Sequence, residues 1–180
     1  MRTLLLQGMF LQPLTEAAPR AEDVAAFALG AELDRQAQRR LGRSLSIRAL
    51  DAGSCNGCEL EMHALSNAFY DLERFGLKFV ASPRHADVLF VTGPVTKNMR
   101  EALERTHNAM PSPKWVVAVG DCAKDGGVFA KSYAVTGGVA PVLPVDLHIP
   151  GCPPRPLDML TGLLRLLRQP GADGIPERCL

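Results

Sequence analysis

Four cysteines have the spacing and the neighbours of ligands to an iron–sulfur cluster. Cys55 and Cys58 form one Cys-x-x-Cys pair in the string CNGC, and Cys122 and Cys152 lie in the strings GDC and IPGCPP. Each cysteine is within two residues of a glycine, which lets main-chain N–H groups come close to inorganic sulfide. Thiolates hold these clusters in sets of four, and a Cys–Pro step ends the common bacterial ferredoxin motif. The pattern predicts one 4Fe–4S cluster.

Two other uses of cysteine compete with this interpretation. Structural zinc with four cysteines usually takes two Cys-x-x-Cys pairs. This chain has one pair, followed by single cysteines 64 and 30 positions further on. Five cysteines in 180 residues are also too few and too scattered for a disulfide framework. The cluster is favoured, the two alternatives stay open, and Cys179 near the C-terminus is expected to be a spare thiol.

Composition indicates one globular domain that does not bind nucleic acid. The 180 residues are 47% hydrophobic and 22% charged, with a net charge of +1, so no positive field would attract a polyanion. No apolar run reaches the length of about 18 residues that a membrane-spanning helix needs. The apolar N-terminus faintly resembles a signal peptide, but Gln7 and Gln12 interrupt it and no cleavage site follows. Reduced cysteines also suit a cytoplasmic chain.

Hydrophobic patterns predict strands that alternate with helices. Strands are expected at 46–50, 78–81, 88–92, 115–119 and the end of 142–149, and helices at 58–75, 97–109 and 156–168. Such alternation indicates a parallel sheet that is covered on both faces. We therefore expect an α/β fold with a single small doubly wound, mainly parallel sheet in a flavodoxin-like layout.

The chain is expected to have three parts, namely an N-terminal arm 1–45, a cluster-binding α/β domain 46–168 and an irregular tail 169–180. The arm should contain an amphipathic helix over 22–41, with Phe27 on one apolar stripe and Leu33 on a neighbouring one. Several arginines make its far end basic. They are either solvated and favoured by the helix dipole, or they dock on a partner subunit or an anionic membrane surface.

The predicted strands bring the four cysteines to one place. Each cysteine follows the carboxyl end of a strand: Cys55 and Cys58 the first, Cys122 the strand 115–119, and Cys152 the last. Open α/β sheets bind their ligands beyond this edge. Cysteines far apart in sequence are therefore expected to be neighbours in space.

Residues 47–168 resemble the iron–sulfur subunit shared by membrane-bound, energy-converting nickel–iron hydrogenases and respiratory NADH:quinone oxidoreductase. The matching strings are GSCNGCELE, YDLERFG, SPRHADVLFVTGPVT, AVGDCA, GGVF and VLPVDLHIPGCPP. The resemblance implies that the four cysteines ligate the 4Fe–4S cluster proximal to an active site. That active site would lie at the interface with a larger partner subunit.

The spacing of the first two cysteines separates the two branches of this family. Quinone reductases typically carry two adjacent cysteines, whereas the spaced pair Cys55 and Cys58 resembles the formate hydrogenlyase-type hydrogenases. The hydrogenase branch implies a large subunit with the nickel–iron site, a ferredoxin-like subunit and membrane subunits, with this chain peripheral on the cytoplasmic side. In this family the nickel–iron site takes two Cys-x-x-Cys pairs from the large subunit, so the resemblance implies that this chain, with one pair, has no complete catalytic site. The equivalent quinone-reductase subunit is the alternative.

Three charged residues complete the expected site. Glu61 shares a helical face with Cys58, and the resemblance implies a part in proton transfer or in subunit contact. Glu59 has capping-box spacing from Asn56, which favours a structural role over an interface role. The resemblance places Arg84 near the partner interface, beside the quinone cavity of the quinone-reducing relatives, and an ordinary surface charge is the alternative.

Overall fold

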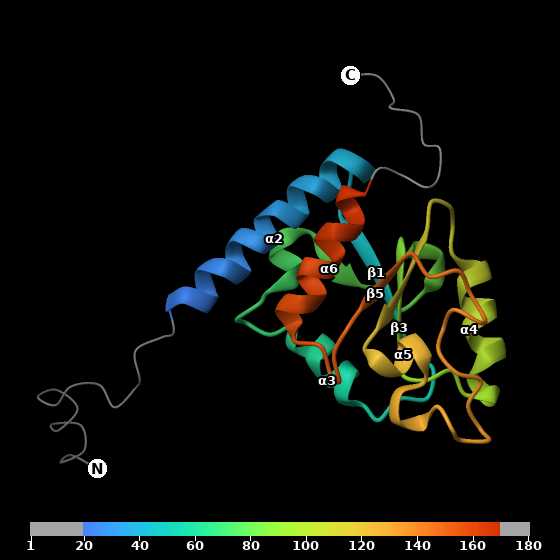
Figure 1. Ribbon diagram of the computed structural model, residues 1–180. Helices are drawn as coiled ribbons and strands as arrows, with labels where there is room; N and C mark the ends of the chain where they lie inside the picture. The colour runs from blue at the N-terminus through green and yellow to red at the C-terminus, as the bar shows by residue number, and fades with distance from the viewer. Residues whose placement is uncertain (1–19, 170–180) are drawn as a thin grey trace, which may run out of the picture.

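The computed structural model describes residues 20–169, which form one five-stranded sheet with helices on both faces (Figure 1). The strands are β1 (Leu45–Asp51), β2 (Leu77–Phe79), β3 (Val88–Thr92), β4 (Trp115–Val119) and β5 (Leu147–Ile149). All neighbouring strands pair in parallel, in the order β2-β1-β3-β4-β5. This is the flavodoxin-like order, and the predicted fold class is confirmed.

Helices on the two faces of the sheet enclose two separate hydrophobic cores. The α-helices are α2 (Arg20–Leu41), α3 (Gly57–Ala64), α4 (Lys97–Ala109), α5 (Asp121–Asp125) and α6 (Pro156–Arg168), and the short 3-10 helices are η1 (Leu72–Phe75), η2 (Pro83–His85) and η3 (Gly127–Phe129). One core lies between the sheet and α2, α3 and α6, and the other between the sheet and α4 and α5. In β3, Phe90 enters the first core and Leu89 the second. Its continuous apolar run follows from burial on both faces.

The helix predicted over 58–75 is wrong, because α3 ends at Ala64. The Oδ1 atom of Asn67 accepts hydrogen bonds from the N–H groups of Phe69 (2.9 Å) and Tyr70 (3.0 Å). Asparagine competes with helical hydrogen bonding in this way. Asp71 then adopts a left-handed backbone with φ 44°, and η1 follows.

Helix α2 packs against α6 and forms part of the first core. Leu33 and Ala37 are fully buried there, whereas Phe27 is 56% exposed and makes an edge-to-face contact with Phe75. Of the two predicted stripes, the one containing Leu33 faces the core, and Phe27 on the other stripe lies at its margin, against the core residue Phe75.

Two of the arginines at the end of α2 make contacts within the chain. Arg40 donates hydrogen bonds from Nη1 to the carbonyls of Leu166 (2.9 Å), Leu167 (3.2 Å) and Gln169 (2.8 Å) at the end of α6. Its guanidinium also lies 4.8 Å from the ring centroid of Trp115. Arg43 forms an ion pair with the buried carboxylate of Asp87.

The division into arm, cluster-binding domain and tail stays a prediction. Residues 1–19 and 170–180, with the tail and Cys179, lie outside the described part of the chain. Within residues 20–169, no helix has the length and apolar character to cross a membrane.

We predict that Arg40→Met lowers the free energy of unfolding by about 2 kcal/mol, a typical value for hydrogen bonds from a charged group. The methionine keeps an apolar stem but leaves the last carbonyls of α6 without their donor. The urea concentration at the midpoint of unfolding should fall, while the slope of the unfolding free energy against urea concentration stays unchanged. Arg39→Met is the control, because Arg39 is exposed. An equal effect of both substitutions would contradict this role of Arg40.

The contact of α2 with α6 should also weaken in acid. Glu32 accepts hydrogen bonds from Gln36, Arg168 and Arg35, which in this order lower its pKa from 4.5 to about 2. A pKa lowered by folding contributes stability above the unfolded value that is lost as the pH falls through the folded value. Glu32→Gln should therefore have a lower melting temperature than the parent chain near neutral pH. The difference between the two melting temperatures should shrink as the pH falls from about 4.5 toward 2. A constant difference would contradict this.

Candidate metal centre

Three turns at the carboxyl edge of the sheet carry the predicted cysteines. Cys55 and Cys58 lie after β1, at the start of α3. Cys122 lies in the first turn of α5, after β4, and Cys152 follows β5. Because the five strands are parallel, these turns share one edge (Figure 1).

The turn after β1 lies against the end of β3. Gly93 has a φ of +73°, and a Cβ atom there would be 2.6 Å from the main chain of Ser54. Oδ1 of Asp51 accepts hydrogen bonds from the N–H groups of Gly53 (2.7 Å) and Ser54 (2.6 Å). Side-chain acceptance of this kind fixes a tight turn. The turn that carries Cys55 is thus fastened at its base and brought close to β3.

The turns after β4 and β5 are tied directly to each other. Gly120 N–H donates to Ile149 O (2.8 Å), and Asp121 N–H donates to Gly151 O (2.9 Å). In return, Gly151 N–H donates to Oδ1 of Asp121 (3.0 Å). These bonds fix the main chain beside Cys122 against that beside Cys152.

Glycines leave room around three of the thiols. A Cβ atom at Gly120 would lie 2.8 Å from Sγ of Cys58, and one at Gly127 would lie 2.8 Å from Sγ of Cys122. At Gly57 the distance to Sγ of Cys55 would be 3.6 Å, an ordinary contact. Side chains at the first two positions would displace a sulfur atom. The thiols therefore lie in a cradle built from main chain, which suits a bulky group with sulfur ligands.

The thiols act on one another electrostatically. Burial, followed by the negative charges of Glu59 and of the other three cysteines, raises the pKa of Cys58 to about 12. Burial also raises the pKa of Cys122, and the nearby Cys152 adds to the effect. All four are free thiols. A group that binds them as thiolates must therefore bring positive charge, as iron does, and displaces protons.

The four thiols are close enough to interact electrostatically, but they do not form a site for a single metal ion in the described part of the chain. Among residues 20–169, no three His, Cys, Asp or Glu side chains are arranged to hold one metal ion. A zinc ion would need each sulfur about 2.3 Å away.

The structure corrects one prediction about Glu59. Asn56 has a left-handed backbone with φ 70°, and its side chain makes no capping hydrogen bond, so the predicted capping box is wrong. Glu59 is an acid in the first turn of α3, but both of its carboxylate oxygens are buried without a hydrogen-bond partner in the described part of the chain. Glu61 is half-buried on the same helix, and Arg84 is exposed in η2. The roles predicted for Glu61 and Arg84 stay predictions.

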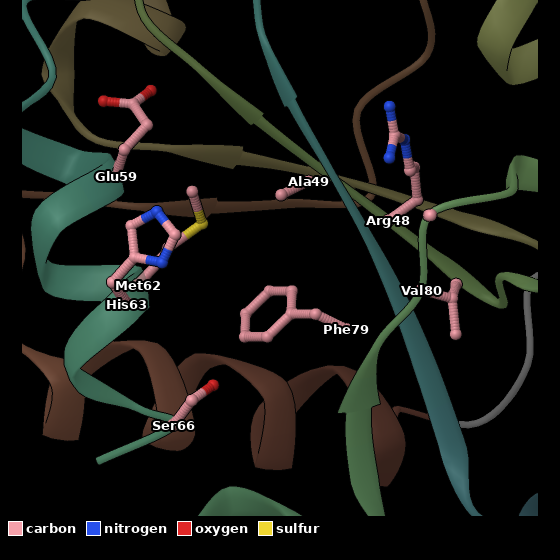
Figure 2. Close-up of a pocket in the computed structure, with 9 residues that line it drawn as sticks. Arg48, Ala49, Glu59, Met62, His63, Ser66, Phe79 and Val80 are labelled. Carbon is pink, nitrogen blue, oxygen red and sulfur yellow. The ribbon is translucent and has the colours of Figure 1, made fainter.

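Sequence reasoning missed a cavity of about 320 Å³ between α3 and β1 (Figure 2). Glu59 and Met62 line it from α3, Arg48 and Ala49 from β1, and Phe79 from the end of β2. The one signal in the sequence was Arg48, a charged residue inside the apolar pattern that predicts the first strand.

Apolar side chains are exposed next to the cysteine turns. Leu60 on α3 is 62% exposed, and Val128 in η3 is 82% exposed. The main chain of Val128 is hydrogen-bonded to the thiol of Cys122. Exposed apolar groups gathered around a site often mark a contact surface.

Comparison with known proteins places this fold and this cysteine set in one family. Residues 55–166 match the family described as NADH ubiquinone oxidoreductase, 20 Kd subunit. The chain belongs to this family of oxidoreductase subunits.

Two curated relatives are similar in sequence. Formate hydrogenlyase subunit 7 of Escherichia coli is 44% identical over 129 residues, which cover 72% of this chain and 51% of that protein. The probable membrane-bound hydrogenase subunit mbhJ of Pyrococcus furiosus is 44% identical over 129 residues, 72% of this chain and 77% of that protein. The chain thus spans about half the length of the first relative and about three quarters of the second.

A solved structure is similar in fold and sequence. It is that of the membrane-bound sulfane sulfur reductase, an archaeal respiratory membrane complex, with a TM-score of 0.62 and 36% identity. The match covers 76% of this chain and 73% of that one. Both hydrogenase and non-hydrogenase complexes therefore contain similar chains.

We predict that Gly120→Ala lowers the amount of metal that the cysteine set retains, because the new Cβ would displace Sγ of Cys58. Gly137→Ala is the matched control. It also places alanine at a positive φ, with a strain of about 1–2 kcal/mol, but nothing lies within 4 Å of the added carbon. Metal content per chain after anaerobic reconstitution is the measurement. Full retention in Gly120→Ala would show that the cradle is not needed.

Proposed function

We propose that this chain is an electron-transfer subunit of a membrane-bound hydrogenase complex and carries one 4Fe–4S cluster on Cys55, Cys58, Cys122 and Cys152. The observation that carries the proposal is the set of four free thiols on three turns at one sheet edge. Tetrathiolate ligation is the usual donor set for such a cluster. Zinc is the competing occupant, and it remains an outcome of the test below.

When bound, the cluster supplies one-electron transfer. The protein's contribution is to hold it between the surface and the core. Cys55 and Cys152 are exposed, whereas Cys122 is buried. The exposed pair brings the site near the surface, where electrons can pass to another subunit, and the glycine cradle lets main-chain N–H groups approach the sulfurs. Such hydrogen bonds and the degree of exposure tune the reduction potential.

The partner of this surface would be a hydrogenase-type large subunit. This chain offers one Cys-x-x-Cys pair, and the nickel–iron site that the resemblance implies needs two. The exposed Leu60 and Val128 support a contact at the cysteine turns. We expect an obligate interface above about 2,000 Å², formed in part by residues 55–61 and by 82–87, where Arg84 lies.

The hydrogenase assignment is favoured over the equivalent subunit of an NADH:quinone oxidoreductase-type complex by the spaced pair Cys55 and Cys58. The names of the two curated relatives also support it. In such an assembly, electrons would pass between the partner's nickel–iron site and a ferredoxin-like subunit. Membrane subunits would anchor the complex, and this chain would be peripheral on the cytoplasmic side.

We expect the anaerobically reconstituted chain to contain about four irons and four sulfides, as a tetrathiolate 4Fe–4S site requires. Cys152→Ala should lose the cluster because it removes one ligand. Cys179→Ala should keep it, since Cys179 stands outside the four-cysteine pattern. Iron, sulfide and zinc analyses of the three proteins make the comparison. Stoichiometric zinc without iron in the unmodified chain would refute the proposal.

Glu61 is proposed to assist proton transfer or subunit contact at the same edge. It lies three positions after Cys58 on α3, and its side chain is half-buried in this chain alone. Docking of a large subunit over the cysteine turns would cover it further. A carboxylate in that position can exchange protons with the partner's active site.

Glu61→Gln should slow proton-coupled turnover of the assembled complex by at least about tenfold, within the range for lost acid–base assistance. The amide keeps the shape of the side chain but cannot ionise. Turnover is compared at equal cluster content, with Glu73→Gln as the control because Glu73 is exposed on η1. If Glu61→Gln assembles and turns over like the parent, the proton role is wrong.

A further inference from the structure

One edge of β1 is open beyond the short strand β2. The ladder between them ends where Val80 N–H donates to Ile47 O (2.8 Å). Main-chain groups of a strand point alternately to its two neighbours, so those of Ala49 and Asp51 point to the same side as those of Ile47. Within residues 20–169, no strand pairs with Ala49 or Asp51 on that side. Open edges of this kind are templates for another strand.

Polar atoms without partners lie beside this edge. Both carboxylate oxygens of Glu59 and Nε of Arg48 are buried and lack a hydrogen bond in the described part of the chain. The two side chains line the same cavity of about 320 Å³ from opposite sides of Ala49 (Figure 2). A buried polar group left in this state costs roughly 1–3 kcal/mol.

The cavity combines these groups with an apolar floor. Met62, Phe79 and Val80 line it together with Glu59 and Arg48, and Val80 lies just after the end of β2 (Figure 2). An occupant that fits must donate to a carboxylate, accept from a guanidinium and place an apolar group against an aromatic ring. An extended peptide meets all three requirements, because its main chain both donates and accepts and its alternate side chains point into the cavity.

We propose that an extended segment of the large partner subunit docks here as an added strand on β1. Its main chain pairs with Ala49 and Asp51, and its groups satisfy Glu59 and Arg48. The large subunit is the occupant because Glu59 directly follows Cys58, so the cavity is continuous with the cysteine turns that the partner covers. The inference rests on the proposed function for the existence of that partner.

Photo-crosslinking in the purified, assembled complex tests the contact. A benzoylphenylalanine probe replaces His63, which is exposed and lines the cavity. We expect crosslinks to one continuous stretch of the large subunit, identified by mass spectrometry. The same probe at the exposed Ala140, which is not among the cavity-lining residues, should give no crosslink to that stretch. A complex with no crosslink from position 63 to the large subunit overturns the proposal, as does a small molecule recovered from the cavity.

A blocking variant tests whether docking matters for assembly. Ala81 is exposed at the mouth of the cavity, so Ala81→Trp should fold normally and obstruct entry. We expect at least a tenfold loss of co-purified large subunit, with unchanged iron per chain and unchanged melting temperature. Ala140→Trp is the matched control and should assemble like the parent. Equal assembly of both variants, or equal loss, overturns the proposal.

Different results would contradict the proposed function and the added strand. A chain that holds no iron, or that has no large partner, contradicts the proposed function. A loaded complex in which the amides of Ala49 and Asp51 exchange with solvent as fast as exposed loop amides contradicts only the added strand. Slow exchange of both amides in the loaded complex supports it.

Discussion

The structure depends on bringing three cysteine-bearing turns together at one edge of the sheet. Parallel strands achieve this because all their carboxyl ends lie at one edge, so residues 64 and 30 positions apart become neighbours. The close approach of these turns also requires glycine at the points of contact, because a side chain would not fit there. At Gly93 a Cβ would collide with Ser54, and at Gly120 it would collide with the sulfur of Cys58. Strand order and glycine positions are thus two parts of one constraint.

The same closeness makes ionisation of the thiols unfavourable. Burial and the neighbouring negative charges raise the pKa of Cys58. Among those charges, the carboxylate of Glu59 has the largest effect on this pKa. Positive charge on a bound group would reverse this balance, so binding of the group and order in the turns should be coupled. The ties between Gly120, Asp121 and Gly151 hold two of the turns by main-chain hydrogen bonds that need no metal.

Much of this arrangement could be predicted from the sequence. The strands Val88–Thr92 and Trp115–Val119 are short apolar runs, as expected for strands that are buried on both faces of a parallel sheet. Their predicted bounds are confirmed. The placement of each cysteine after a strand is also confirmed. The stop of α3 at Ala64 was missed because it depends on the side chain of Asn67 accepting two local hydrogen bonds. Helix α5 has five residues, too few for a periodic pattern.

The cavity beside β1 could not be predicted, because it depends on where the pairing of β1 and β2 stops. Strand patterns give the existence of an edge strand but not the residue at which it leaves its neighbour. Glu59 therefore looked like a capping acid, and Arg48 like one more basic residue near the N-terminal helix. The structure places the two side chains on one cavity and leaves the Glu59 carboxylate and the Arg48 Nε without a hydrogen bond in the described part of the chain.

Electron paramagnetic resonance of the anaerobically purified, reduced chain in its complex tests the central claim most directly. Substitution of Cys122 by serine, compared with the unmodified protein, assigns the signal to this site. The account predicts a 4Fe–4S signal of about one unpaired electron per chain that is lost or altered in the variant. A complex with full subunit content and no such signal from this chain in any reduced state, and with zinc in its place, would contradict it.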